Sequence, residues 1–540
     1  MRGGQTQKLY LDGKTGRGPF YRDQTKPRPN ILLISVDMVP PEFLLKDRAE
    51  IAVSTPNLDA LRSEGVFFRN CFSTAPLCSP SRASYLTGRY SYITANAERG
   101  HDGHAVHLRE QDILFPEYLK AAGYHTRHSG KCHVGARKFL EVFGENDSPW
   151  DRWSPPWYDD EQYIRFLEAR DLEPFAFERT IHGGSTVPGR QGNLYGGWIA
   201  GQKGRPFPKE ATYPAYLIDR ALPALATTKP LYLQLDFFAP HQPFAIPGGM
   251  ELREEQIRRQ MTLPESYREL AARGYLSPEG EPRVYRLYRK NWGMEEERTL
   301  TDYRVANQLQ FELIDELLGR LFEELRSRDL YDSTWIVFLA DHGEMNGELG
   351  LIDKGAYLHP RVVRAPLMIK PPKNASVPGR GGEIDQPCSL LDLAPTILDI
   401  CGIETPERLD GRNLLATAEG GERPADKPLI FEVWHHVVPN PCVGTVFQAS
   451  DGRWYSYVYN GADDRDELYR LGGTGEQDGP NCIGDPALEK IRSEGVRTLA
   501  ARMEADPRWF VYAQYLNLEY AELLPRGAGD RQLFVGKEEQ

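Results

Sequence analysis

Three strongly apolar runs end in polar residues, and this feature most constrains the fold of the 540-residue chain. The run NILLISVD ends at Asp37, STWIVFLADHGE carries Asp341 and His342 near its end, and LYLQLDFFAPHQPF has His241 just past its apolar part. Short runs that are apolar throughout are typical of parallel strands buried on both faces. Each polar residue taken singly could be a turn or helix-capping residue. Together they predict an α/β enzyme, because ligands bind at the carboxyl ends of such strands.

Helical periodicity between and after these runs completes the α/β pattern. Residues 305–328 and 388–403 place apolar side chains at three- and four-residue spacing, as amphipathic helices do. Beyond residue 415 the pattern changes to short alternating strands around a D-G turn, followed by a helix. We therefore predict four segments, which are a polar extension at 1–28, a catalytic domain at 29–415, a small α+β domain at 425–510 and a tail at 511–540.

Composition limits the class of partner. Lys and Arg number 65 and Asp and Glu 77, a net charge of −12 that argues against binding nucleic acid by phosphate neutralisation. No apolar segment approaches the roughly 20 residues that cross a bilayer, and the first thirty residues lack a secretory signal. We expect a cytoplasmic protein that does not bind membranes. The aromatic-rich tail at 511–540 predicts a homo-oligomer, a dimer or tetramer, although it could instead pack on its own domain.

The stretch APLCSPSRASYLTG sets Cys78 just before a predicted helix, two residues from Pro80 and four from Arg82. The seven cysteines are odd in number, widely spread and without a C-x-x-C pair, which indicates neither a disulfide framework nor a cysteine zinc site. Cys78 could therefore be a core thiol, a metal ligand, a nucleophile or the precursor of a modified residue.

The order of several motifs resembles one family. PLCSPSRASYLTGRY resembles the signature of the sulfatases, and GYHTRHSGKCHVG resembles their second signature. APHQPF, LADHGEMNGELGLIDKGAY and SLLDLAPTILDICGI resemble later elements in the family's order, so the likeness spans about Asn30 to Leu471. The chain is thus similar to the formylglycine-dependent sulfatases of the alkaline-phosphatase-like superfamily, in their arylsulfatase and phosphonate monoester hydrolase branches. The resemblance implies an α/β/α sandwich with a large mixed, mostly parallel sheet, plus a smaller C-terminal domain with an antiparallel sheet and a helix.

The resemblance also implies a modification of Cys78. A formylglycine-generating enzyme would recognise Pro80 and Arg82 and oxidise the cysteine to formylglycine (3-oxoalanine), whose aldehyde hydrates to a gem-diol. One hydroxyl would attack sulfur to form a covalent sulfo-enzyme hemiacetal, and the second would expel sulfate by restoring the aldehyde. Arg82 would then remain in the site to hold the modified side chain.

The matched positions also imply a metal site and a set of proton donors and cations. One divalent metal ion, calcium first and manganese or magnesium as alternatives, would bind Asp37, Cys78, Asp341 and His342. Lys131 and Lys354 would hold the sulfuryl oxygens. His133 would serve as the base, and His241 as the proton donor to the leaving oxygen.

Two positions depart from the family pattern. Met38 stands where a second acidic or amide ligand is usual, so the metal either loses a protein ligand or takes another, with Asp102 and His104 as candidates. His342 replaces the usual asparagine, which resembles the phosphonate monoester hydrolases and favours manganese. Lys131 and His133 instead favour sulfatases, because the phosphonate branch is expected to carry Tyr and Thr there.

The predicted activity is hydrolysis of small anionic esters, namely aryl or small alkyl sulfates. The alternative is a phosphonate monoester or phosphodiester hydrolase that uses the same site, because metal and cations stabilise both transfers. A third reading is a binding protein in which Met38 marks a decayed metal site. The aromatic region 150–215 is expected to form loops at the pocket mouth, which fits a small aryl ester better than a long acidic polysaccharide.

Overall fold

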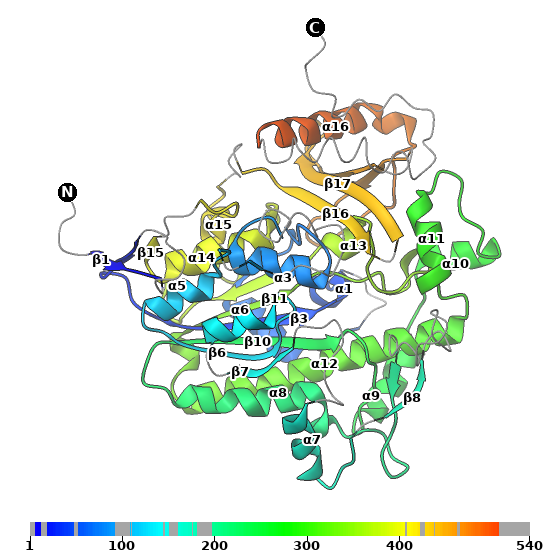
Figure 1. Ribbon diagram of the computed structural model, residues 1–540. Helices are drawn as coiled ribbons and strands as arrows, with labels where there is room; N and C mark the ends of the chain where they lie inside the picture. The colour runs from blue at the N-terminus through cyan, green and yellow to red at the C-terminus, as the bar shows by residue number, and fades with distance from the viewer. Residues whose placement is uncertain are drawn as a thin grey trace.

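A mixed eight-stranded sheet forms the centre of the computed structural model (Figure 1). Its strand order is β13-β4-β12-β11-β3-β10-β6-β7. The structure describes residues 6–11, 19–47, 52–91, 108–109, 111–143, 146–150, 160–174, 176–180, 197–404, 408–421, 427–436, 438–461 and 465–506.

Four neighbouring parallel strands make the middle of this sheet. They are β11 (Thr334–Ala340), β3 (Asn30–Asp37), β10 (Leu231–Pro240) and β6 (His125–Lys131). Every residue of β10 and β11 is buried, and so is every residue of β3 after Asn30, as expected for strands covered on both faces. The three apolar runs of the sequence are therefore confirmed as central strands.

The outer strands make the sheet mixed rather than wholly parallel. β7 (Asn146–Trp150) adds in parallel to β6, and β13 (Gly382–Ile384) adds in parallel to β4 (Val66–Phe68). β12 (Leu367–Lys370) is antiparallel to both of its neighbours, β11 and β4. The prediction of a mixed, mostly parallel sheet is correct.

Helices cover both faces of the sheet, which confirms the predicted α/β/α sandwich (Figure 1). One face carries α8 (Tyr213–Ala221) and the 31-residue α12 (Glu297–Ser327). The other face carries α3 (Cys78–Thr87), α5 (Phe115–Ala121), α6 (Ala136–Phe143) and α14 (Leu393–Ile400). Further helices are α1 (Pro41–Leu45), α2 (Pro56–Glu64), α7 (Glu161–Glu168), α9 (Glu251–Gln260), α10 (Glu265–Ala272), α11 (Arg283–Trp292) and α13 (Pro360–Val363).

The helix expected at 388–403 is shorter than predicted. The segment opens with strand β14 (Cys388–Ser389), which pairs with β5 (Cys71–Phe72), and α14 begins only at Leu393. The Asp392 carboxylate accepts hydrogen bonds from the backbone N–H groups of Ser389 and Arg412, each at 2.8 Å. These bonds fix a turn before the helix, and apolar periodicity alone does not reveal them.

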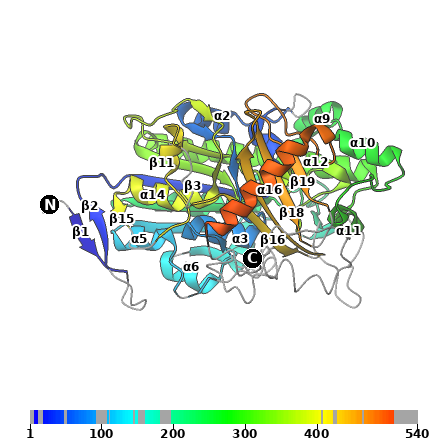
Figure 2. The ribbon, with the colours of Figure 1, turned by 90° about the horizontal axis from the view of Figure 1, so that it is seen from above.

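A separate antiparallel sheet follows the sandwich. Its order is β16 (Ile430–His436), β17 (Val438–Gln448), β18 (Trp454–Asn460) and β19 (Glu467–Arg470). The predicted D-G turn is Asp451-Gly452, where the φ of +82° at Gly452 suits glycine. Helix α16 (Glu489–Glu504) lies diagonally across this sheet (Figure 2). The predicted antiparallel sheet with a C-terminal helix is confirmed.

Other segments are more regular than the sequence indicates. The predicted polar extension contains β1 (Thr6–Leu9) and β2 (Phe20–Asp23), and β2 also pairs with β15 (Ile403–Glu404). Helix α15 (Leu414–Ala418) crosses the predicted end of the catalytic domain at residue 415.

Region 150–215 is not only loops, and one of its aromatic residues is structural. It contains α7, β8 (Phe177–Thr180) and β9 (Gly197–Ile199), and Trp198 is buried against Phe244. Asp102, His104 and the tail 511–540 lie outside the described residues.

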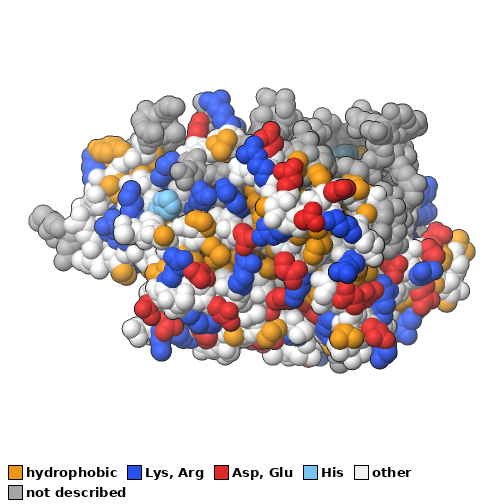
Figure 3. All heavy atoms as spheres, turned by 90° about the horizontal axis from the view of Figure 1, so that it is seen from below, with side chains coloured by type: hydrophobic (Ala, Val, Ile, Leu, Met, Phe, Trp, Pro, Cys, Tyr) orange, Lys and Arg blue, Asp and Glu red, His pale blue; other side chains and the backbone are white. Residues whose placement is uncertain are grey.

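The face seen from below carries Lys and Arg interspersed with Asp and Glu (Figure 3). None of the helices within the described ranges is long and apolar enough to cross a membrane.

Candidate active site

The predicted site residues follow the carboxyl ends of four adjacent strands. Asp37 ends β3, Lys131 ends β6, His241 follows β10, and Asp341 with His342 follows β11. All five side chains are buried. Parallel strands bring their carboxyl ends to one edge of the sheet, so residues some 300 positions apart in sequence meet here.

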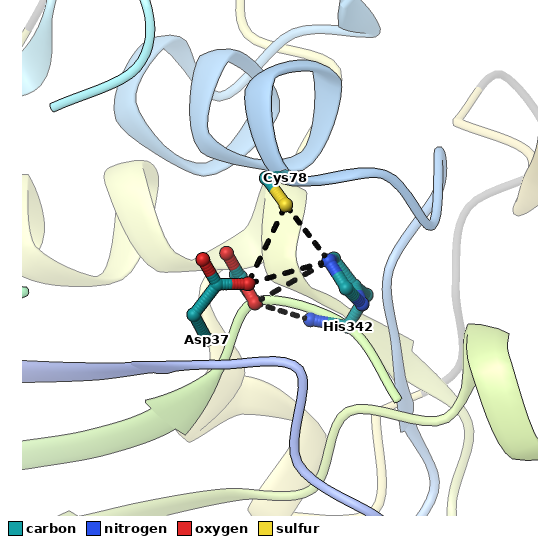
Figure 4. A group of neighbouring side chains, drawn as sticks. Asp37, Cys78 and His342 are labelled. Carbon is teal, nitrogen blue, oxygen red and sulfur yellow. Dashed lines mark hydrogen bonds and ion pairs between the residues drawn. The ribbon is translucent and has the colours of Figure 1, made fainter. Parts of the chain in front are cut away.

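Four side chains form a candidate metal site. One ligand atom from each of Asp37, Cys78, Asp341 and His342 lies within 4.8 Å of the others, and all four residues are buried. The Cys78 Sγ lies 3.4 Å from Asp37 Oδ1 and 3.3 Å from His342 Nε2. Figure 4 shows Cys78 at the start of its helix, pointing toward Asp37 and His342. Two carboxylates, an imidazole and a converging fourth side chain fit a divalent cation.

The orientation of His342 suits metal binding. Its Nδ1 lies 2.8 Å from the carbonyl oxygen of Gly343, which can only accept, so Nδ1 carries the proton. The lone pair on Nε2 therefore faces Asp37 and Asp341, whose Oδ1 atoms lie at 3.6 and 3.8 Å. Burial, followed by the positive charge of Lys354, lowers the pKa of His342 to about 3, so the ring is a neutral ligand at neutral pH.

The Met38 thioether contacts a lysine of the site. Its Sδ accepts from Lys354 Nζ at 3.6 Å, and its backbone N–H donates to Asp341 Oδ1 at 3.1 Å. Met38 has a φ of +60°, a left-handed conformation that costs a side-chain-bearing residue free energy and is common at functional sites. Among the described residues, the side chains at this edge that could hold a metal ion are Asp37, Asp341 and His342, together with residue 78.

Cys78 occupies the first position of α3, within the candidate metal site. Burial, and then the negative charge of Asp37, raise the pKa of its thiol to about 12. The metal-free thiol is therefore protonated at neutral pH and is a poor nucleophile. This position suits a side chain that is modified before it acts.

Lys131 and Asp37 form a fully buried ion pair that joins Lys131 Nζ to Asp37 Oδ2. Burial would raise the pKa of Asp37, but Lys131, followed by His241 and Arg82, outweighs burial and holds that pKa well below its usual range. The pKa of Asp341 is instead raised to about 7 by burial and then by the charge of Asp37. The pair leaves Asp37 as an ionised donor for a cation.

Arg82 connects the second carboxylate to the rest of the site. Its Nη2 lies 3.0 Å from Asp341 Oδ2, and its Nη1 donates to the backbone carbonyl of Lys131 at 3.0 Å. The same Nη1 lies 3.0 Å from Asp236 Oδ1. Sequence reasoning missed Asp236, although a charged residue inside the apolar run LYLQLDFFA was a signal for it.

The remaining predicted residues, His133, His241 and Lys354, lie among the same buried charges. Burial, and then the charge of Lys131, lower the pKa of His133 well below 6.5, and burial and Lys354 do the same to His241. The Nδ1 of His241 donates to the Gln242 carbonyl at 3.0 Å, so its Nε2 has the lone pair when the ring is neutral. Lys354 Nζ lies 3.2 Å from Asp353 Oδ1. The structure thus brings together every predicted site residue that it describes.

The α/β sandwich and the buried cluster of acid, imidazole and cysteine side chains at its strand ends agree with the hydrolases of the alkaline phosphatase superfamily. The family model described as "Sulfatase" matches residues 29–403, and the chain belongs to the sulfatase family. A second model, "N-sulphoglucosamine sulphohydrolase, C-terminal", matches residues 347–505.

Individual relatives agree with this family, and a solved structure shares the fold. The chain is 28% identical over 406 residues to the uncharacterized sulfatase YidJ of Escherichia coli (strain K12), covering 73% of this chain and 71% of that protein. It is 27% identical over 468 residues to a choline-sulfatase of Rhizobium meliloti (strain 1021), covering 83% and 81%. The phosphonate monoester hydrolase structure from Silicibacter pomeroyi has the same fold, with a TM-score of 0.62 and 23% identity over 88% of this chain and 96% of that one.

Proposed function

We propose that this protein hydrolyses sulfate monoesters of aryl or small alkyl groups, with formylglycine at position 78 as the nucleophile. The observation that carries the proposal is the location of Cys78 Sγ within 3.4 Å of Asp37 and 3.3 Å of His342, at the start of a helix and inside a ring of cations. The hydrate of formylglycine would supply one hydroxyl for attack on sulfur and a second for release of sulfate.

Each surrounding residue supports one part of this chemistry. Asp37, Asp341 and His342 would hold the divalent cation, which would act as a Lewis acid toward the diol and the sulfuryl oxygens. Lys131 and Lys354 are buried, so their fixed charges act on the sulfuryl oxygens with little screening by water.

The two histidines have opposite roles in proton transfer, because one would accept a proton and the other would donate one. His133 is neutral at physiological pH because burial and Lys131 lower its pKa, so it can take the proton of the second hydroxyl. His241 is also neutral without substrate, and an anionic ester beside it would raise its pKa. This change would favour protonation of Nε2, the atom that would then donate to the leaving oxygen.

The imidazole of His342 bears both on which metal ion binds and on which class of ester is hydrolysed. Calcium is our first choice of cation, and the imidazole of His342 supports manganese as the alternative, with magnesium as a third. The same imidazole, together with the fold shared with a phosphonate monoester hydrolase, favours phosphonate monoesters or phosphodiesters as the second candidate substrates. Lys131 and His133, and the relatives named as sulfatases, support sulfate esters first.

Two measurements on protein made with a formylglycine-generating enzyme test the proposal. Mass spectrometry of the peptide that contains residue 78 should show a side chain in which an aldehyde replaces the CH₂–SH group. A comparison of kcat/KM for an aryl sulfate and an aryl phosphonate monoester should favour the sulfate. Cys78→Ala is the matched control and should abolish turnover. An unmodified thiol in active protein would refute the nucleophile, and a higher kcat/KM for the phosphonate would reverse the substrate order.

A further inference from the structure

A buried carboxylate lies directly behind the candidate active site. Asp236 is a fully buried residue of β10, and it has four hydrogen-bonding or ion-pairing partners. Its Oδ1 lies 3.0 Å from Arg82 Nη1 and accepts from the Tyr85 hydroxyl at 3.3 Å. Its Oδ2 accepts from Gln234 Nε2 at 2.7 Å and lies 2.8 Å from His128 Nε2. A buried carboxylate with this many partners has little freedom to rotate.

Arg82 transmits the position of Asp236 to the active site. One end of its guanidinium group pairs with Asp236 and donates to the Lys131 carbonyl, and the other end lies 3.0 Å from Asp341. The guanidinium group is planar and rigid, so fixing one end fixes the other. Asp236 therefore helps determine where Asp341, a candidate metal ligand, and the backbone of Lys131 lie.

His128 in turn holds Asp236. Its ring lies edge-on to Phe139, with centroids 4.6 Å apart, and 5.4 Å from the ring of Phe143. It stands on β6, which runs parallel to β10, with Gly130 opposite Asp236. A Cβ at Gly130 would come within 2.0 Å of the Asp236 carbonyl oxygen, so the two strands approach closely just before Lys131. The two aromatic rings thus pack against the His128 ring while its Nε2 lies 2.8 Å from Asp236 Oδ2.

We propose that Asp236, oriented by His128, is a positioning residue that fixes Arg82 and through it the metal ligand Asp341 and Lys131. The inference rests on the proposed function only for its effect on turnover, because its effect on metal affinity does not require a substrate. Asp236 also divides the charge of Arg82 between two carboxylates. The negative charge of Asp236 therefore offsets part of the positive charge of Arg82, which would otherwise oppose a cation bound at Asp341.

The test uses full-length protein, Asp236→Asn, and two substitutions of His128. His128→Gln keeps an N–H donor at a similar reach, and His128→Leu removes it. We expect Asp236→Asn and His128→Leu to lower kcat for an aryl sulfate by about 10- to 100-fold, with KM changed by less than about threefold, and to weaken Ca²⁺ or Mn²⁺ binding about tenfold. His128→Gln should stay within about threefold of the wild type in both measurements.

Asp315→Asn is the matched control, because Asp315 is a buried carboxylate that instead accepts the backbone N–H groups of Asn57 and Leu58. It should lower thermal stability while leaving kcat and metal affinity unchanged. If Asp236→Asn behaves in the same way, Asp236 is only structural and the inference is wrong. If wild-type protein does not hydrolyse sulfate esters, the proposed function fails, and isothermal titration with Ca²⁺ or Mn²⁺ alone still decides the role of Asp236.

Discussion

Replacement of Lys131 by methionine tests how the site keeps Asp37 ionised. Both side chains are fully buried, and Lys131 is the strongest of the charges that hold the pKa of Asp37 below its usual range. Methionine keeps the length and apolar stem of lysine but removes its charge. Asp37 must then either remain as a buried, unpaired carboxylate, which costs about 3–5 kcal/mol, or take up a proton.

The cost of protonating Asp37 sets how strongly Lys131→Met destabilises the fold at each pH. Keeping a carboxyl protonated costs about 1.4 kcal/mol for each pH unit above an unfolded pKa of about 3.9. The protonated carboxyl alone therefore costs the variant at most about 4 kcal/mol at pH 7 and about 1.5 kcal/mol at pH 5, and the lost stabilisation of the wild type adds an amount that does not change between these pH values. The sign follows from the two pKa shifts. The lowered pKa of the wild type stabilises the fold above about pH 3.9, and the raised pKa of the variant destabilises it over the same range.

The assay is urea unfolding of wild type and variant at pH 5, 6 and 7, with a chelator present. Lys370→Met is the control, because Lys370 is also buried but donates to the backbone carbonyls of Tyr331 and Thr334. Its pKa is lowered to about 8 by burial, so it stays largely protonated in this pH range and its effect should not vary with pH. A difference between wild type and Lys131→Met that is equal at pH 5 and 7 would refute the reasoning. Saturating metal should shrink the difference, because the cation would neutralise Asp37.

Three further outcomes are expected. Because burial and Lys131 keep His133 neutral, kcat/KM at saturating metal should show no acidic limb near pH 6.5, and a limb that persists there would contradict its role as base. Tyr288→Phe should cost about 1–3 kcal/mol in urea unfolding and lower kcat, because the Tyr288 oxygen accepts from the backbone N–H of Ala356 at 2.7 Å, two residues past Lys354, and donates to the His436 carbonyl. Unchanged kcat would show that this bridge does not position Lys354. Asp341→Ala should lose bound metal by elemental analysis, and a full equivalent of metal would remove Asp341 from the ligand set.

Much of the site could be predicted because its residues stand in local patterns. Asp37, Asp341 and His241 directly follow apolar runs. Because the carboxyl ends of parallel strands lie at one edge of the sheet, these residues are expected there whatever the strand order. Cys78 and Arg82 lie within one short stretch that enters a helix. Boundaries were less accurate, since the turn before α14 depends on a hydrogen bond that the backbone N–H of Arg412, twenty residues away, donates to the Asp392 carboxylate.

The sequence by itself determined which chemical groups stand at the strand ends, because alternation, apolar runs and short motifs are local properties of the chain. Only the tertiary structure decided what those groups face. It brings the Met38 thioether to Lys354, turns the His342 lone pair toward two carboxylates, and joins His128 to Asp236 across two strands. These relations depend on strand register and on charge–charge distances in a buried site, and residues far apart in sequence set both.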